Sequence, residues 1–185
     1  MELDRTIKSR KSVRKFKDKK PDWREIIDCI DSARYAPMAG GIFTLKFIIV
    51  DDPKKIQKIA EASQQPFISN SKIVVIACSN PSILMNAHGK KGEVYLHQQA
   101  GAAIQNFLLK IQEKGLATTW IGYFAENLIK EILKIPEKIN VEALFPIGYE
   151  FKEEKPKTKI DLDSILYFET YGNKRMKKPD IVGNR

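Results

Sequence analysis

The run Ile73–Ser79 (Ile-Val-Val-Ile-Ala-Cys-Ser) places the strongest constraint on the fold of this chain. It is apolar throughout and rich in β-branched residues, which is typical of a strand that is covered on both faces. A strand of this kind needs other strands beside it and helices above and below it. Because helical patterns separate the other strand-like segments, we expect a three-layer α/β or α+β architecture.

Other strands are expected at Phe43–Val50, Leu116–Ile121 and Val141–Tyr149. Pro146 in the last of these predicts a sheet edge or a bulge, because proline has no N–H to donate. The predicted helices cover about residues 2–9, the stretch from Asp22 to the stop at Pro37, and about residues 53–63, 93–114, 128–133 and 163–171. Residues 80–92 are expected to form a loop, and residues 173–185 a polar tail.

Two of the predicted helices carry informative side-chain patterns. In the second helix, Trp23, Ile26, Ile27, Ile30 and Ala33 fall on one stripe that we expect to be buried. In the long helix, the small residues Ala100 to Ala103 permit close approach of another helix or of a flat ligand.

Composition excludes several classes of protein. Of the 185 residues, 43% are hydrophobic and 30% are charged, which fits a globular chain of one domain. No apolar run reaches the ~18 residues that cross a bilayer, and the N-terminus lacks the apolar core of a secretory signal. Cys29 and Cys78 are the only cysteines, which indicates a reducing, cytoplasmic setting. With only His88 and His97, common zinc sites and Ser–His or Cys–His catalysis have little support.

The net charge of +9 is concentrated at the two ends of the chain. Residues 1–20 carry +6 and residues 173–185 carry +4, whereas the middle carries −1. A basic end is compatible with nucleic acid, an acidic membrane surface or a phosphate-bearing ligand, and equally with a solvated terminus. The charge alone leaves these alternatives open.

Four segments could carry chemistry. In the first, Arg10-Lys11-Ser12-Val13-Arg14, an extended backbone would present Arg10, Ser12 and Arg14 on one side, where they could hold a phosphate. The small-residue loop Ala36–Gly41 and the strand end Gly115–Gly122 could line a flat ligand with backbone groups. The fourth segment, Lys155–Lys159, could close over a phosphate. Each also has a plain structural reading as a charged surface, a turn, a core strand or a linker.

The order of these segments along the chain resembles the FMN-dependent nitroreductase family. The resemblance rests on R-x-S-x-R, a helix ending in Ala-Pro, a small-residue loop, an Ala-rich helix, G-L-x-x-x-W-I-G, Phe-Pro-Ile-Gly-Tyr and Lys-Pro-Lys, and it extends from Arg10 to Asn173. It implies an α+β three-layer sandwich, with a central, mostly antiparallel sheet flanked by helices. Residues 1–185 would form a single domain of an intertwined homodimer, with FMN at the subunit interface.

The resemblance also implies where FMN would bind. Arg10 and Ser12 would hold its phosphate with Lys157 and Lys159, and Lys11 and Arg14 would lie nearby, one of them near the pyrimidine end of the flavin. Trp120, Ile121 and Gly122 match the segment that runs beside the flavin ring. Pro37, Met38 and Ala39 match the loop that reaches the flavin held mainly by the other subunit, and Gln98 matches a position near the ring. The resemblance assigns no catalytic side chain and no metal, because the flavin carries the chemistry.

In one place the chain departs from the family pattern. Members usually carry Asn-x-Gln-Pro after the small-residue loop, where this chain has Gly41-Ile42-Phe43-Thr44. The implied activity is an oxidoreductase that takes reducing equivalents from NAD(P)H or another donor and passes them to a quinone, a nitro compound or a similar small acceptor. The departure keeps open a specialised flavin enzyme, acting in flavin fragmentation, dehalogenation or cofactor or peptide oxidation. A module that binds nucleic acid is the least favoured alternative, because no RNA-recognition signature is present.

Overall fold

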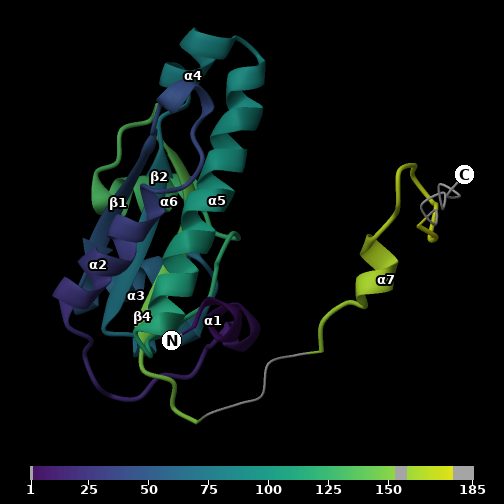
Figure 1. The fold of residues 1–185 in the computed structure, drawn as a ribbon. Coiled ribbons are helices and arrows are strands. Elements are labelled where there is room, and N and C mark those ends of the chain that lie inside the picture. The colour runs from purple at the N-terminus through teal and green to yellow at the C-terminus, as the bar shows by residue number, and fades with distance from the viewer. Residues whose placement is uncertain (1, 153–157, 177–185) are drawn as a thin grey trace, which may run out of the picture.

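The computed structural model describes residues 2–152 and 158–176 of the chain (Figure 1). The helices are α1 (Leu3–Ser9), α2 (Trp23–Ala33), α3 (Pro53–Ala62), α4 (Pro81–His88), α5 (Lys91–Glu113), α6 (Glu126–Leu133) and α7 (Leu162–Ile165), with short 3-10 helices η1 (Ala39–Gly41) and η2 (Pro66–Asn70). The strands are β1 (Leu45–Val50), β2 (Ile73–Ser79), β3 (Ala117–Thr118) and β4 (Asn140–Gly148).

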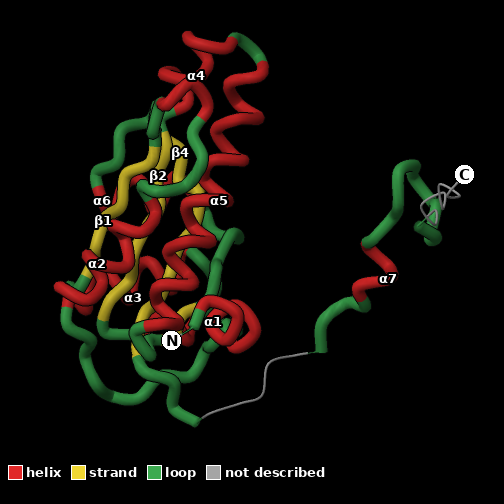
Figure 2. The backbone as a smooth tube through the Cα atoms, viewed as in Figure 1, coloured by secondary structure: helices red, strands yellow, loops and turns green. Residues whose placement is uncertain are grey.

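The four strands form one antiparallel sheet in the order β1-β2-β4-β3 (Figure 2). All seven residues of β2 are buried, as its unbroken apolar sequence predicts. Leu45 pairs with Ser79 at one end of the β1–β2 ladder and Val50 pairs with Val74 at the other. β2 therefore lies inside the sheet, between β1 and β4.

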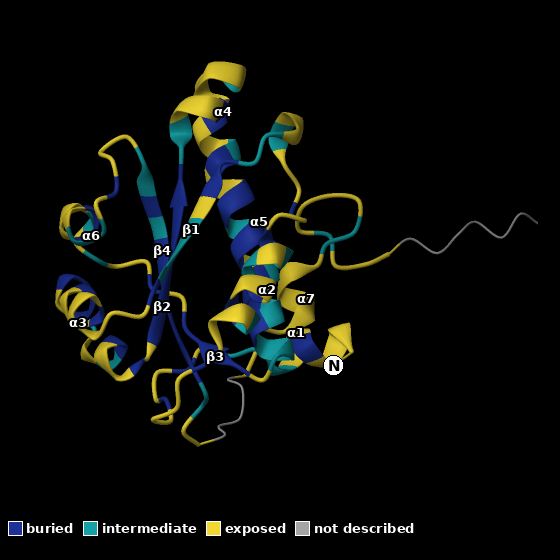
Figure 3. Ribbon diagram, turned by 90° about the vertical axis from the view of Figure 1, so that its left-hand side faces the viewer, coloured by how far each residue is buried: buried dark blue, intermediate teal, exposed yellow. Residues whose placement is uncertain are grey.

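Helices cover the sheet on both faces (Figure 3). On one face, α2 and α5 bury a core that includes Ile26, Ala103 and Phe107 against Val75 and Phe145 of the sheet. On the other face, residues of α3 and α6 such as Ile59 and Ile129 pack in a second core with the sheet. The predicted three-layer α+β sandwich with an antiparallel sheet is confirmed.

The small residues of α5 face the interior of the same chain. Ala100 and Ala103 are 3% and 0% exposed, and they belong to the core that α2 also enters. The helix that approaches them is therefore α2. Gly101, on another face of α5, is half-buried, and no atom lies within 4 Å of a Cβ built on it. The small side chains of Ala100 and Ala103 therefore allow close packing in the core, whereas the missing side chain of Gly101 leaves open space beside the helix.

The buried stripe predicted for α2 is only partly present. Ile26, Cys29 and Ala33 are fully buried, and Asp22 caps the helix by accepting a hydrogen bond from the Arg24 backbone N–H. Trp23 and Ile27 are instead 52% and 46% exposed. The buried face of α2 is narrower than predicted, because α5 and the sheet contact only one side of this helix.

Residues 80–92 were predicted to form a loop, and that prediction is wrong. Asn80 accepts a hydrogen bond from the Ser82 backbone N–H, and Pro81 occupies the first turn of α4. Gly89, with a φ of 57°, ends the helix. The residues that suggested a loop are therefore the boundaries of a short helix. α4 packs closely on α5, since a Cβ on Gly92 would lie 2.3 Å from the Leu84 carbonyl oxygen.

The prediction of an edge at Pro146 is also wrong, because β4 is an internal strand. The predicted strand Leu116–Ile121 pairs with β4 only at Ala117–Thr118 and at an isolated bridge between Ile121 and Leu144. The Leu144 N–H points toward this neighbour and donates to the Ile121 carbonyl. Because the N–H groups of every second residue in a strand point the same way, the nitrogen of Pro146 also points toward residues 117–121. The pairing of β4 with that segment is interrupted at Pro146, so the missing N–H of proline costs no hydrogen bond of the sheet.

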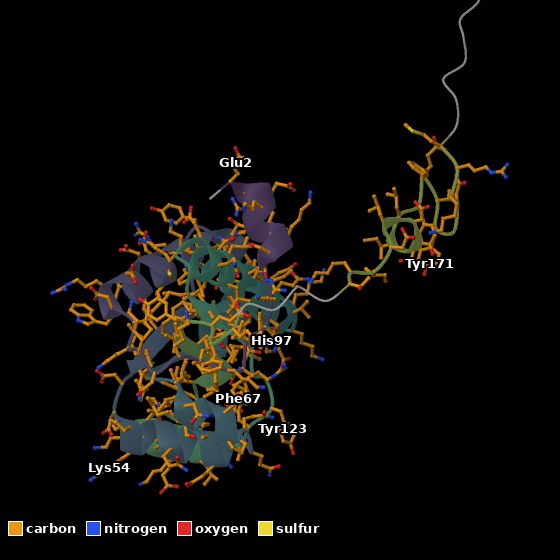
Figure 4. The ribbon with its side chains drawn as sticks, turned by 90° about the horizontal axis from the view of Figure 1, so that it is seen from below. Glu2, Lys54, Phe67, His97, Tyr123 and Tyr171 are labelled. Atoms are coloured by element: carbon orange, nitrogen blue, oxygen red, sulfur yellow. The ribbon has the colours of Figure 1, made fainter. Side chains whose placement is uncertain are left out.

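The C-terminal part of the described chain lies apart from the sandwich (Figures 1 and 4). It contains α7, which is shorter than the helix predicted over about residues 163–171. Several large apolar side chains are exposed in this part, namely those of Ile160, Leu162, Ile165 and Tyr171. We call residues 158–176 the C-terminal arm. None of the helices in the described part of the chain combines the length and apolar character needed to cross a bilayer.

Candidate functional site: a basic edge of the sheet and a loop beside helix α5

The basic segment Arg10–Arg14 runs along an edge of the sheet. The Val13 N–H donates to the Thr118 carbonyl at 2.9 Å, and the Lys17 N–H donates to the Tyr149 carbonyl at 2.8 Å. Val13 and Phe16 are buried against Ala117 in a small apolar cluster. Backbone pairing and two buried side chains therefore fix the segment to β3 and to the end of β4.

This pairing separates the side chains of the segment. Ser12 and Arg14 are exposed, whereas Val13 between them is buried, so residues 12 and 14 point away from the apolar cluster. Arg10 is half-buried at the end of α1. The Lys11 ammonium forms an ion pair with Glu150 at 2.9 Å, with only 15% of its side chain exposed. Lys11 and Arg14 are the two cations predicted near the pyrimidine end of the flavin, and of these Lys11 is already paired with a carboxylate.

A glycine makes the close approach of this segment possible. A Cβ placed on Gly148 would lie 2.8 Å from Cδ1 of Phe16, which is shorter than any normal carbon contact. The Phe16 ring therefore lies directly on the backbone of β4. This contact holds the basic segment to the sheet.

The segment Trp120–Gly122 follows β3 on the same edge. The Trp120 indole is 42% exposed and meets the Phe145 ring edge-on, with centroids 5.8 Å apart. Ile121 is buried on the opposite face, in the core with α3 and α6, and Gly122 is exposed. Of the three residues predicted beside the flavin ring, Trp120 presents a side-chain surface on the α5 face and Gly122 presents backbone.

The loop Pro37–Ala39 lies elsewhere in the protomer. It lines a cavity of about 420 Å³ together with Tyr95, Gln98, Gln99 and Ala102, which share one face of α5. The structure therefore brings Gln98 together with the small-residue loop within one chain, a contact that the sequence did not predict. Gln98 is about 25 Å along the helix from Gly115, which precedes β3 and the basic edge.

An amide from α5 holds the stretch that follows this loop. Gln99 Oε1 accepts hydrogen bonds from Thr44 N and Thr44 Oγ1 at 3.0 and 2.9 Å, and Gln99 Nε2 donates to the Ile42 carbonyl at 2.7 Å. Sequence reasoning did not predict this role for Gln99. The chain has no amide at residues 41–44, and an amide 55 residues later in the sequence holds their backbone instead.

Two aromatic residues near this cavity were also missed. The rings of Tyr95 and His88 meet edge-on with centroids 5.4 Å apart, and His88 stands over Gly40 of η1. Nε2 of His88 is enclosed and has no hydrogen-bond partner in the described part of the chain. Both residues fall where the sequence indicated a loop or a helix start, so no periodic pattern could have placed them together.

The two C-terminal lysines are placed differently from the other candidates. Lys157 lies outside the described residues. Lys159 is exposed and belongs to the C-terminal arm, which lies apart from the sandwich (Figure 1). Within one described protomer, the arm does not bring Lys159 to Arg10 and Ser12.

The two thiols are poor nucleophiles. Burial raises the pKa of Cys29 to about 12 and that of Cys78 to about 11, because the thiolate loses its hydration in each core. Both therefore stay neutral at physiological pH.

The fold and the site define a class of protein, the α+β sandwich oxidoreductases. An FMN-dependent nitroreductase from Clostridium difficile has the same fold, with a TM-score of 0.77 at 27% identity over 90% of this chain and 98% of that one. The model of the nitroreductase family matches residues 7–149. The chain therefore belongs to the nitroreductase family and is an oxidoreductase, which confirms the predicted family and enzyme class.

Two curated relatives cover most of the chain. One is a putative NADH dehydrogenase/NAD(P)H nitroreductase from Archaeoglobus fulgidus, which is 27% identical over 80% of this chain and 85% of its own length. The other is an iodotyrosine deiodinase from Thermotoga neapolitana, which is 26% identical over 86% of this chain and 92% of its own length. The fold therefore occurs in proteins named for different reactions.

Proposed function

We propose that this protein is an FMN-dependent oxidoreductase that passes reducing equivalents from NAD(P)H to a small electron acceptor in the cytoplasm. The observation that carries the proposal is the pairing of Val13 with Thr118, which sets the arginine-bearing segment beside the half-exposed Trp120. The name of the Clostridium difficile neighbour states FMN dependence, and that of the Archaeoglobus relative states a nicotinamide donor.

The residues at the basic edge fit FMN. Arg10 and Ser12 suit a terminal phosphate, since a guanidinium donates two parallel hydrogen bonds and a hydroxyl adds a third. Lys157 and Lys159 would add charge from the C-terminal end. Arg14 would lie toward the pyrimidine, and Trp120 and Gly122 beside the ring, whereas Ile121 between them is buried in the other core. When bound, FMN supplies the hydride-transfer chemistry, and the protein binds it, orients it and excludes water.

The proposed active form is a homodimer in which each chain is a single domain. The loop Pro37–Ala39 and the basic edge lie at distant positions along α5, so the loop of one chain would complete the site of its partner. The exposed apolar residues of the C-terminal arm, among them Ile160, Leu162 and Ile165, would be buried on the second copy. Lys159 would reach the phosphate in this assembly.

The proposed acceptor is flat and apolar, such as a quinone. Gly41 and Phe43 stand where the family usually has polar amides, Ile42 lies between them, and Phe43 packs against the main core. In the described chain, the side-chain amide that bonds to this stretch is that of Gln99, whose oxygen and nitrogen both bond to Thr44 and Ile42. Dehalogenation is the second candidate, because the Thermotoga neapolitana relative is named a deiodinase.

The cofactor is tested first. Purified protein should be yellow, and heat should release a flavin that mass spectrometry identifies as FMN. Recovery of FAD, or failure to bind FMN on reconstitution, would refute the proposal. A colourless protein with a steeply salt-dependent affinity for DNA or RNA would instead favour a nucleic-acid-binding module.

The acceptor is tested by comparing kcat/KM for a quinone, a nitrofuran and an iodinated phenol under one donor. We expect the quinone to be the best of the three. Gly41→Asn should improve the nitrofuran relative to the quinone, because it returns an amide to the loop. Gly41 has a φ of 71° and open space around it, a conformation that Asn tolerates better than most residues. An iodinated phenol as the best acceptor would favour dehalogenation.

A further inference from the structure

A bulge in β4 places a carboxylate between a serine and a histidine. Ala77 of β2 pairs with Ala143, but the next residue, Cys78, pairs with Val141, so Glu142 is left out of the ladder. One carboxylate oxygen of Glu142 accepts a hydrogen bond from the Ser79 hydroxyl, and the other lies 3.2 Å from Nδ1 of His97. The Glu142 side chain is only 11% exposed, whereas that of His97 is 54% exposed.

This arrangement fixes the protonation pattern of the His97 ring. An ionised carboxylate can only accept hydrogen bonds, so the hydrogen on Nδ1 must point at Glu142. In the neutral ring the other nitrogen, Nε2, is then the basic one, and in the charged ring it carries a proton that it can donate. A carboxylate that holds an imidazole in this way is how many enzymes orient a general acid or base.

The pair lies near the segment predicted to run beside the flavin. Glu142 and Phe145 are three residues apart on β4, about 10 Å along the strand, and Phe145 contacts the Trp120 ring. Since Ile121 bridges Leu144 with antiparallel geometry, Gly122 and Tyr123 continue toward the level of Glu142. His97 from α5 and Trp120 both lie on the α5 face of the sheet.

We infer that His97, oriented by Glu142, is the general acid that protonates the electron acceptor. The inference rests on the proposed function. In this step a quinone takes two electrons and one proton from the reduced flavin and a second proton from Nε2 of His97. The Nε2–H bond breaks as the O–H bond of the hydroquinone forms, the flavin is oxidised, and the neutral imidazole regains a proton from solvent.

The groups around His97 are few in the described structure. Glu142 of β4 contacts it directly and Ser79 of β2 holds the far oxygen of that carboxylate. Behind them, the charges of Glu142, Glu126 and Lys130 act on the Cys78 thiol. Glu126 and Lys130 both belong to α6 and form an ion pair with each other at 3.1 Å. Glu142 is therefore the one charged group among these that contacts the ring.

The first test reads the ring itself, without flavin or turnover. Nitrogen-15 NMR of the apo protein, at a pH where imidazole is neutral, should show His97 with its hydrogen on Nδ1. In Glu142→Gln, whose amide can donate as well as accept, that preference should weaken or reverse. His88 is the only other histidine and provides the internal control, since its signal should not change. A His97 tautomer with the hydrogen on Nε2 in the wild-type protein would overturn the inference.

The second test separates the two halves of the reaction by stopped flow on the FMN-loaded protein. His97→Gln keeps a donor for Glu142 but cannot transfer a proton. We expect reduction by NAD(P)H within twofold of wild type, and reoxidation by a quinone slower by about 100-fold or more, as loss of a general acid implies. The wild-type reoxidation rate should depend on pH, and the variant should lack this dependence. Ser79→Ala should give an intermediate loss.

Three outcomes would contradict the inference. Reoxidation of His97→Gln at the wild-type rate would show that solvent supplies the proton. An equal slowing of both half-reactions would show that His97 only ties α5 to the sheet. The same pH profile in the wild type and in His97→Gln would show that His97 donates no proton in this step. A protein that binds no FMN would refute the proposed function, while the NMR test would still decide the geometry of the pair.

Discussion

Arg10 provides the sharpest test at the scale of single residues. A charge-assisted hydrogen bond contributes about 1.5–3 kcal/mol, so Arg10→Ala should weaken FMN binding at least about tenfold. Ser12→Ala should have a smaller effect, because a neutral hydroxyl contributes less. Fluorescence titration of the apo protein with FMN measures both.

The matched control for this prediction is Arg24→Ala. Arg24 is an exposed arginine at the start of α2, paired with Asp22 at 3.7 Å, so the variant makes the same charge change away from the basic edge. Its FMN affinity should equal that of the wild type. If Arg10→Ala also binds FMN with wild-type affinity, the phosphate is held elsewhere.

The two cysteines give a prediction about reactivity and pH. With folded pKa values of about 12 and about 11, neither Cys29 nor Cys78 forms appreciable thiolate at pH 8, so both should resist a thiol-specific reagent until the protein unfolds. Because both folded pKa values are raised, the contribution of the neutral thiols to the free energy of unfolding is complete below the unfolded pKa of about 8.5. This contribution declines as pH rises toward the folded pKa values. Colorimetric thiol counting with and without urea measures this, and fast labelling of native protein would contradict it.

At the scale of elements, Gln99 joins α5 to the entrance of β1. Gln99 is 3% exposed, and Gln99→Leu would leave the Ile42 carbonyl and the Thr44 N–H without their hydrogen-bond partners. This loss should lower the free energy of unfolding by about 1–3 kcal/mol for each unpaired group. Urea denaturation measures the loss. Gln98→Leu is the matched control, since it makes the same chemical change one residue away, where the described structure shows no such bonds. Equal stabilities of the two variants would refute the role of Gln99.

Helix boundaries were predictable where local chemistry sets them. The sequence predicted a helix over about residues 53–63, and in α3 Asp52 caps this helix by accepting from the Lys54 backbone N–H while Pro53 stands in its first turn. The same chemistry starts α4, but Asn80-Pro81 and the two glycines of residues 80–92 are also typical of a loop, and the sequence was interpreted in that way. The pattern also predicted too long a strand around Ala117, since an apolar run does not reveal where its partner diverges.

The candidate site was predictable only as separate segments. Motif order identified the family and the basic segment, because those residues are close in sequence. The bonds from Gln99 to Thr44 and from Ser79 to Glu142 join residues 55 and 63 positions apart, and no local pattern encodes such contacts. His97 depends on a bulge in β4, which only the paired register reveals. The sequence therefore indicated which ligand to expect but not which side chains meet around it.

At the scale of the whole molecule, the proposed homodimer is tested on α5. Gly101 of this helix is half-buried and a Cβ on it would meet open space, so Gly101→Arg should fold and give a monomer that has lost most of its FMN affinity. Ala103→Arg should instead disrupt the fold, because Ala103 is 0% exposed within its own chain. Light scattering after gel filtration, with flavin absorbance, measures both. A Gly101→Arg monomer that binds FMN fully would refute the shared site.

The attachment of the basic segment to the sheet has a consequence for how the chain is made. Val13 bonds to Thr118 and Lys17 bonds to Tyr149, so these residues leave the ribosome more than a hundred residues before their partners. Such distant pairings close late, because a long loop must be ordered before they form. The segment that we expect to bind the cofactor is therefore synthesised well before its partners and is among the last parts of the sandwich to reach its folded position.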